Sequence, residues 1–95
     1  MILKNIRHYL KLPLNRGNME KIGERIGMLR HEILRFQTRY GLSYEKFYIS
    51  VAADEDFVQN LRKSHTTWER DFNAWEYYIE ELNEWLGHLE SISKN

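Results

Sequence analysis

Acidic side chains recur at one-turn spacing near the end of the chain. Glu76, Glu80 and Glu84 stand four residues apart, and Glu81 lies beside them in the sequence. Residues four apart share one face of a helix, so the row predicts a ridge of carboxylates. Facing rows of carboxylates can hold Mg²⁺, but the heptad pattern described below places this row on an outer face. We therefore interpret it as a solvated acidic surface rather than a metal site.

No other pattern in the sequence carries specific chemistry. None of the four histidines follows a glutamate by three residues, as a di-iron bundle requires. His31-Glu32 lacks the second histidine of a zinc-protease motif, cysteine is absent, and there is no glycine-rich phosphate loop. We therefore predict that the protein is not an enzyme and has no catalytic residue, metal ion or cofactor.

Two segments contain apolar residues in which steps of three and four alternate, the spacing of a heptad seam. The first predicts a helix from about residue 19 to residue 40, capped by Asn18 and ended by Gly41. The second predicts one long helix from about residue 55 to residue 91, with Asp54 as its N-cap and His65 as the one polar seam residue. The apolar seam residues are Met19, Ile22, Ile26, Leu29, Ile33, Phe36 and Tyr40, then Val58, Leu61, Trp68, Phe72, Trp75, Ile79, Leu82, Leu86 and Leu89.

A short aromatic helix is predicted between these two segments. Ser43 is its N-cap, and Tyr44, Phe47, Tyr48 and Val51 share one helical face. The sequence therefore predicts an all-α fold, in which two long heptad-patterned helices form an antiparallel hairpin joined by a short helix and assemble into a dimeric bundle. Residues 18–95 form the helical domain and residues 1–17 a basic N-terminal arm. No apolar run approaches the ~20 residues of a membrane span, so we expect a cytoplasmic protein.

The predicted last helix has more aromatic surface than its own seam needs. Tyr78 and Trp85 share a position beside the seam, which widens the apolar face enough to contact two helices. The predicted first helix is about 33 Å long and the last about 55 Å, so the first leaves part of the last uncovered. Aromatic residues with a polar group are enriched in protein interfaces. The predicted protein-binding residues are Tyr77, Tyr78, Trp85, Glu76, Glu80, Glu81 and Glu84.

Short motifs in residues 36–89 occur in a recognisable order. They are Arg39-Tyr40-Gly41-Leu42-Ser43-Tyr44-Glu45-Lys46-Phe47, Glu55-Asp56-Phe57, Trp68-Glu69-Arg70-Asp71 and Trp75-Glu76. This part of the chain resembles a group of small bacterial and archaeal antitoxin-like helical proteins, although their Gly-containing acidic loop is replaced here by Ser50-Val51-Ala52-Ala53-Asp54. The resemblance implies a non-enzymatic antitoxin that neutralises a small basic toxin by direct contact.

The basic arm leaves a nucleic-acid alternative open. Lys4, Arg7, Lys11 and Arg16 give residues 1–19 a net charge of +4, whereas residues 54–95 carry −6. In this alternative the chain is a homo-oligomeric structural protein whose arm binds nucleic acid weakly and in a salt-sensitive way. The simpler interpretation is that the basic and acidic parts attract each other within one fold.

A small helical enzyme is the third alternative. The long–short–long order of predicted helices resembles that of small helical chorismate mutases, whose site needs several cationic side chains converging on a dicarboxylate. Arg25, Arg30, Arg35 and Arg39 are available on the predicted first helix. A strictly apolar seam leaves no polar pocket between the helices, so a pocket with converging arginines is the feature that would favour this alternative.

Overall fold

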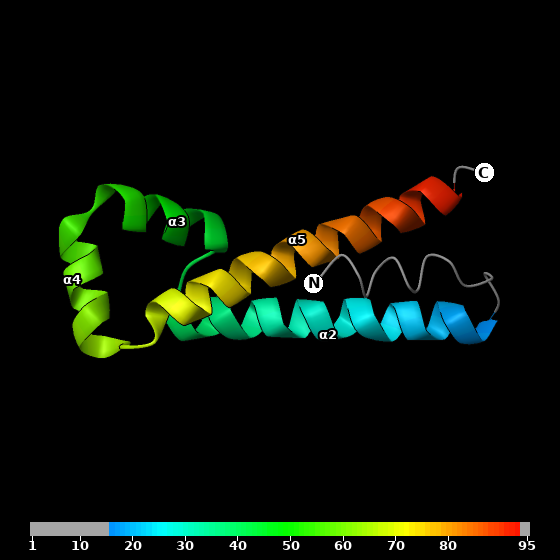
Figure 1. Ribbon diagram of the computed structural model, residues 1–95, viewed down its shortest axis with the longest axis horizontal. Helices are drawn as coiled ribbons and strands as arrows, with labels where there is room; N and C mark the ends of the chain where they lie inside the picture. Colours follow the sequence, from blue (N-terminus) through cyan, green and yellow to red (C-terminus); the bar gives the residue numbers. More distant parts are fainter. Residues whose placement is uncertain (1–15, 94–95) are drawn as a thin grey trace.

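Four helices follow one another in the computed structural model, which describes residues 16–93. They are α2 (Arg16–Tyr40), α3 (Tyr44–Ala53), α4 (Glu55–Ser64) and α5 (Trp68–Ser93). The predicted all-α class is therefore confirmed for the described part of the chain (Figure 1). Of the basic residues predicted to form the arm, Arg16 begins α2, and Lys4, Arg7 and Lys11 lie outside the described residues.

The junctions on either side of α3 follow the predicted capping chemistry. Gly41 ends α2 with a φ of 69°, a conformation in which a side chain would crowd the backbone. The Ser43 hydroxyl accepts a hydrogen bond from the Lys46 N–H at 3.2 Å. The Asp54 carboxylate accepts one from the Phe57 N–H at 3.1 Å. These contacts satisfy backbone donors at the start of α3 and α4, which confirms both predicted N-caps.

We expect Gly41→Ala to lower the free energy of unfolding by about 1 kcal/mol, because alanine must adopt the left-handed conformation at this junction. The matched control is Gly87→Ala within α5, where an added Cβ meets nothing within 4 Å. That control should raise the free energy of unfolding by up to about 1 kcal/mol through better helix propensity. Urea unfolding followed by circular dichroism measures both changes. Equal changes in the two variants would contradict the proposed role of Gly41.

The prediction of one long helix from residue 55 to residue 91 is wrong. Helix α4 ends at Ser64, and His65 is its C-cap, with φ −137° and ψ 82°, rather than a seam residue. The break falls at Ser64-His65-Thr66-Thr67. A serine side chain can hydrogen-bond to the backbone in place of the helical bonds, and β-branched threonines lose side-chain freedom in a helix. The Ser64 hydroxyl donates a hydrogen bond to the Asn60 carbonyl at 2.8 Å. Leu61 and Trp68 are seven residues apart, which is one heptad. The apolar spacing is therefore the same on both sides of the corner, and it does not reveal that the helix ends there.

The corner between α4 and α5 folds α3 and α4 into a cap at one end of the molecule (Figure 1). One buried hydrophobic cluster joins this cap to both long helices. Its members come from all four helices and are Phe36, Phe47, Leu61, Trp68 and Trp75. The cap thus packs on the start of α5, and the short aromatic helix α3 contributes Phe47 to the shared cluster.

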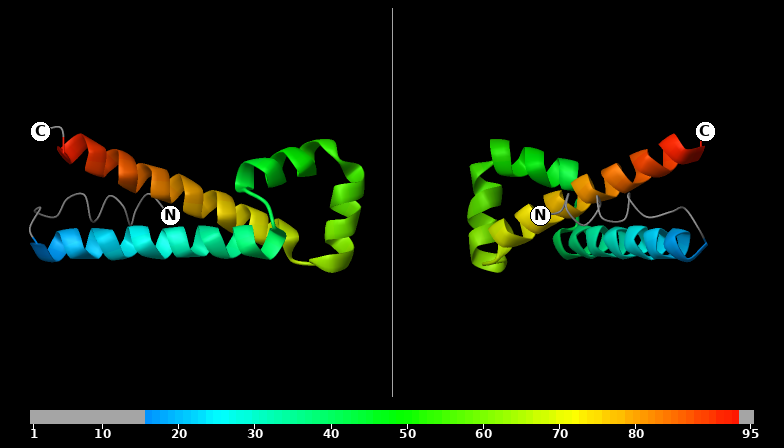
Figure 2. Two further views of the ribbon diagram at one scale, coloured as in Figure 1. Left: turned by 180° about the vertical axis from the view of Figure 1, so that it is seen from behind. Right: turned by 45° about the vertical axis from the view of Figure 1, so that its right-hand side comes forward.

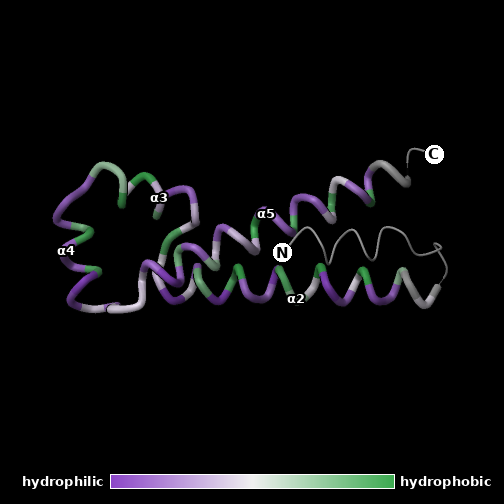
Figure 3. Tube along the Cα trace, viewed as in Figure 1, coloured by the Kyte–Doolittle hydropathy of each residue, from purple (hydrophilic) through white to green (hydrophobic). Residues whose placement is uncertain are grey.

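Helices α2 and α5 lie side by side and run in opposite directions, since Arg25 pairs with Glu81 and Tyr40 with Asp71. A second buried cluster joins Ile22, Ile26 and Leu29 of α2 to Trp85 of α5. Figure 2 shows the two helices diverging toward the end away from the cap. Figure 3 shows hydrophobic residues recurring along α2 with hydrophilic residues between them. No helix in residues 16–93 is both long enough and apolar enough to cross a membrane.

Candidate functional site

The predicted contact face of α5 is only partly on the surface. Glu76, Glu80 and Glu84 are exposed, as their predicted outer position requires. Tyr77 and Tyr78 are half-buried and meet edge to face, with ring centroids 5.4 Å apart. The three glutamates form an exposed row, which we call the acidic ridge, and the two tyrosines border it.

Trp85 and Glu81 do not belong to that surface. The expectation that the first helix leaves Trp85 uncovered is wrong, because Trp85 is fully buried against α2. Glu81 is also fully buried, so its predicted place on the acidic surface is wrong. The physical reason is the rotation of α5, which turns the line Tyr78, Glu81 and Trp85 toward α2. Their spacing of three and four residues was a signal that could have shown this shared face.

Glu81 is held in the core by an ion pair with Arg25. The Arg25 Nε–H donates to the Glu81 Oε1 at 2.8 Å, and an Nη2–H donates to the same oxygen. The other oxygen of Glu81 is buried and has no hydrogen-bond partner among the described residues. Burial, and then the negative charge of Glu81, raise the pKa of Tyr77. Because a charged pair inside an apolar interface is costly to separate, the Arg25–Glu81 pair fixes the register of α2 against α5.

A groove runs between α2 and α5 beside the acidic ridge. It has a volume of about 490 Å³ and is lined by Arg25, Met28, Asn73, Ala74, Tyr77 and Tyr78. Met28 keeps 38% of its surface exposed, and a flexible thioether adapts to different partners. The groove and ridge together, which we call the α5 contact face, offer apolar area next to negative charge.

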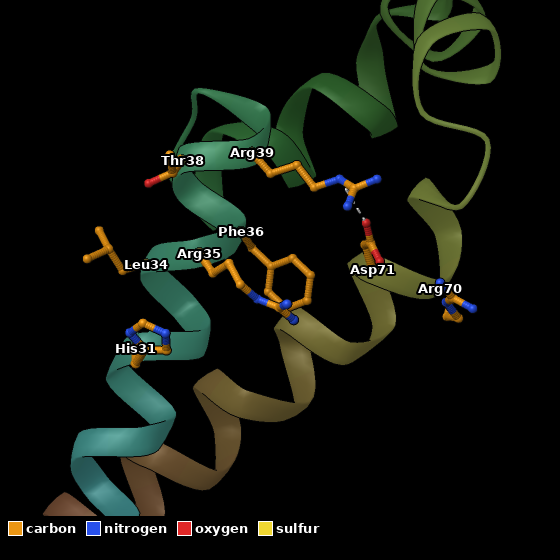
Figure 4. Close-up of a pocket in the computed structure, with 8 residues that line it drawn as sticks. All are labelled: His31, Leu34, Arg35, Phe36, Thr38, Arg39, Arg70 and Asp71. Atoms are coloured by element: carbon orange, nitrogen blue, oxygen red, sulfur yellow. Dashed lines mark ion pairs between the residues drawn. The ribbon is translucent and has the colours of Figure 1, made fainter.

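A larger cleft lies nearer the cap (Figure 4). It has a volume of about 650 Å³, and α2 contributes most of its lining. The lining residues are His31, Leu34, Arg35, Phe36, Thr38 and Arg39 of α2 with Arg70 and Asp71 of α5. Three arginines and one carboxylate therefore line this cleft, which we call the arginine cleft. The sequence pattern indicated Arg35 and Arg39 but not Arg70 or Asp71.

Asp71 anchors the arginine cleft to the core. It is buried, and its Oδ2 accepts a hydrogen bond from the Tyr40 hydroxyl at 2.6 Å. The Arg39 Nε lies 3.4 Å from the same oxygen. Asp71 stands three residues after Trp68 and four before Trp75, so its position on the buried face was visible in the spacing.

Tyr40 should make the protein sensitive to alkali. Burial, and then the hydrogen bond to Asp71, raise the pKa of Tyr40 from 10.0 to about 12. The folded state binds this proton more tightly than the unfolded state. The resulting stability is therefore complete below pH 10.0 and is lost as the pH rises through about 12.

We expect Tyr40→Phe to flatten the decline of stability over that alkaline range and to lower stability at neutral pH by about 1 kcal/mol. Urea unfolding at several pH values measures both effects. The control is Tyr48→Phe, since Tyr48 is 54% exposed. The same pH profile in wild type and Tyr40→Phe would show that Tyr40 does not contribute.

The rest of the described chain adds no metal centre to these two surfaces. In residues 16–93, no group of three or more histidine, aspartate or glutamate side chains is placed to hold a metal ion. Comparison with protein-family models, with curated proteins and with solved structures found no match for this chain.

Proposed function

We propose that this protein acts by binding another protein through the α5 contact face. The observation that carries the proposal is the exposed row of Glu76, Glu80 and Glu84 beside the groove of Met28 and Tyr77. Apolar and aromatic surface supplies affinity, whereas the row of like charges selects a partner of opposite charge. The partner is therefore a small protein with a basic surface.

Two charges of the ridge, those of Glu80 and Glu84, are available to such a partner. Glu80 and Glu84 form no ion pair with any residue in the described part of the chain. Glu76 lies near α3, where burial, and then its carboxylate, raise the pKa of Tyr44 to about 12. Adjacent carboxylates repel one another, so a basic partner relieves this repulsion and associates faster at low ionic strength.

In its most specific form the proposal is that the partner is a toxin and this chain its antitoxin. The support is the resemblance of residues 36–89 to small helical antitoxins, together with the acidic ridge. Toxins that act on RNA carry basic clefts, and a ridge of carboxylates competes for such a cleft. Such an antitoxin works by occupying the cleft of the toxin and needs no chemistry of its own.

We extend the proposal to a dimeric bundle. Ile79, Leu82, Leu86 and Leu89 of α5 pack against the buried clusters but stay half-buried, and a second copy would cover the apolar surface that they leave exposed. Sedimentation equilibrium measures the mass in solution. A monomer at all concentrations would remove the dimer from the proposal without affecting the binding of a different partner.

The test is co-purification from the native host at low salt, followed by titration of the companion protein. We expect a stoichiometric basic protein whose affinity falls at least tenfold when Glu76, Glu80 and Glu84 are all replaced by glutamine, about 1.4 kcal/mol or more. The control replaces three exposed acids elsewhere, Glu45, Glu55 and Glu69. Equal losses in the two triple variants would mean that only net charge matters and would overturn the α5 contact face.

A further inference from the structure

The arginine cleft points to a second binding function, separate from the protein contact proposed above. We propose that this cleft binds a small molecule that carries a phosphate group. The site is formed by Arg35 and Arg39 of α2 and Arg70 of α5. It lies toward the cap, away from Glu80 and Glu84 of the acidic ridge.

The arginine cleft is positively charged. Three guanidinium groups and one carboxylate give its lining a net charge of +2 with His31 neutral. This positive concave surface occurs where α5 and α2 meet, although residues 54–95 as a whole carry −6. A concave surface concentrates the potential of its charges, so the cleft attracts anions despite the acidic helix behind it.

The arginines of the cleft have hydrogen-bond donors that the protein itself does not use. A guanidinium has five N–H donors, and the Arg39 Nε is the donor that lies near Asp71, at 3.4 Å. Arg35 pairs with Glu32 at 2.8 Å on the surface of the same helix, and such exposed pairs contribute little. Arg70 forms no ion pair with any residue between 16 and 93. Several donors are therefore free to bind one anion.

Two of the arginines are oriented by neighbouring aromatic rings. Figure 4 shows Arg35 and Arg39 extending from α2 toward α5, with Asp71 opposite them. The guanidinium of Arg35 lies 5.6 Å from the centre of the Phe36 ring, and that of Arg39 lies 5.8 Å from the Tyr40 ring. Stacking on aromatic rings orients these groups before a ligand arrives.

The chemistry of the lining selects the ligand class. Planar guanidinium groups match the oxygens of a phosphate, which can accept two parallel hydrogen bonds from each. Leu34 is 58% exposed at the same cleft and supplies apolar contact. A phosphomonoester with an apolar or aromatic group therefore fits the site better than inorganic phosphate.

The test is a titration of the full chain with phenyl phosphate and with inorganic phosphate, followed by amide chemical shifts in NMR. We expect saturable shifts confined to residues around the cleft, with phenyl phosphate the tighter ligand. Arg35→Gln and Arg70→Gln should each weaken phenyl phosphate binding about tenfold. Arg30→Gln is the matched control, because Arg30 is exposed on the opposite face of α2 and should leave the affinity unchanged.

Three results would overturn the proposal. The first is the absence of saturable binding of phenyl phosphate to the folded wild-type protein. The second is an equal loss of affinity in Arg30→Gln and in the cleft variants, which would indicate a response to total charge. The third is binding of a single-stranded oligonucleotide that depends on Arg35 and Arg70 while phenyl phosphate does not bind, since the cleft would then be a nucleic-acid surface.

Discussion

Replacing Arg25 by alanine should lower the free energy of unfolding by about 3 kcal/mol. Glu81 is fully buried, and Arg25, whose side chain is 25% exposed, is the cation that forms its ion pair. Removing Arg25 leaves a carboxylate in an apolar interface without its counter-charge, which costs more than the intact pair contributes. Because proteins of this kind are stable by about 5–15 kcal/mol, the variant should unfold at markedly lower urea concentration.

The matched control is Glu84→Ala, since Glu84 is exposed and lies three residues further along α5. It should change stability by less than about 0.5 kcal/mol. The double variant Arg25→Leu, Glu81→Leu should recover most of the loss, because two apolar side chains can replace a buried ion pair without penalty. A double variant as unstable as Arg25→Ala would contradict this account and show that the pair is needed for packing.

The second large effect is expected at Trp75, the central residue of the cluster that joins all four helices. We expect Trp75→Ala to lower the free energy of unfolding by about 4 kcal/mol, through lost burial and the cavity left behind. The side chain is fully buried, and its ring lies 5.8 Å from Phe36 and 5.5 Å from Phe47. It also stacks on Tyr40 at 6.1 Å. The loss should therefore detach the cap and not only loosen α5.

Trp75→Phe separates ring packing from the indole N–H. The Trp75 Nε1 is buried and has no hydrogen-bond partner among the described residues, so removing it also removes a desolvation penalty. We expect Trp75→Phe to cost about 1–2 kcal/mol, well below the cost of alanine. The surface control is Tyr48→Ala, whose side chain is 54% exposed. Losses of similar size in Trp75→Ala and Tyr48→Ala would contradict the central position of Trp75.

Local chemistry in the sequence determined the helical class and several helix ends. Gly41, Ser43 and Asp54 act on backbone groups within three or four residues of themselves, so their effect does not depend on the rest of the fold. The α2 seam was likewise readable, since Ile22, Leu29 and other members of its apolar line are buried as the periodicity predicts.

Tertiary structure decided the rotation of α5, and the heptad spacing by itself did not reveal the corner at His65. Heptad spacing describes positions along a helix, and the same spacing is satisfied whether His65 continues a helix or ends one. The face that α5 buries depends on packing from two sides, α2 on one and the cap on the other. That packing turns Glu81 and Trp85 inward and leaves Glu80 and Glu84 outside.

The candidate sites divide in the same way. The acidic ridge was predicted from the sequence because residues four apart share a helix face whatever the helix packs against. The arginine cleft brings Arg39 beside Asp71, residues far apart in the chain, through the antiparallel pairing of α2 and α5. The buried Arg25–Glu81 pair and the two hydrophobic clusters align the two helices. Because the contact between Arg39 and Asp71 depends on that alignment, no local sequence pattern predicts it.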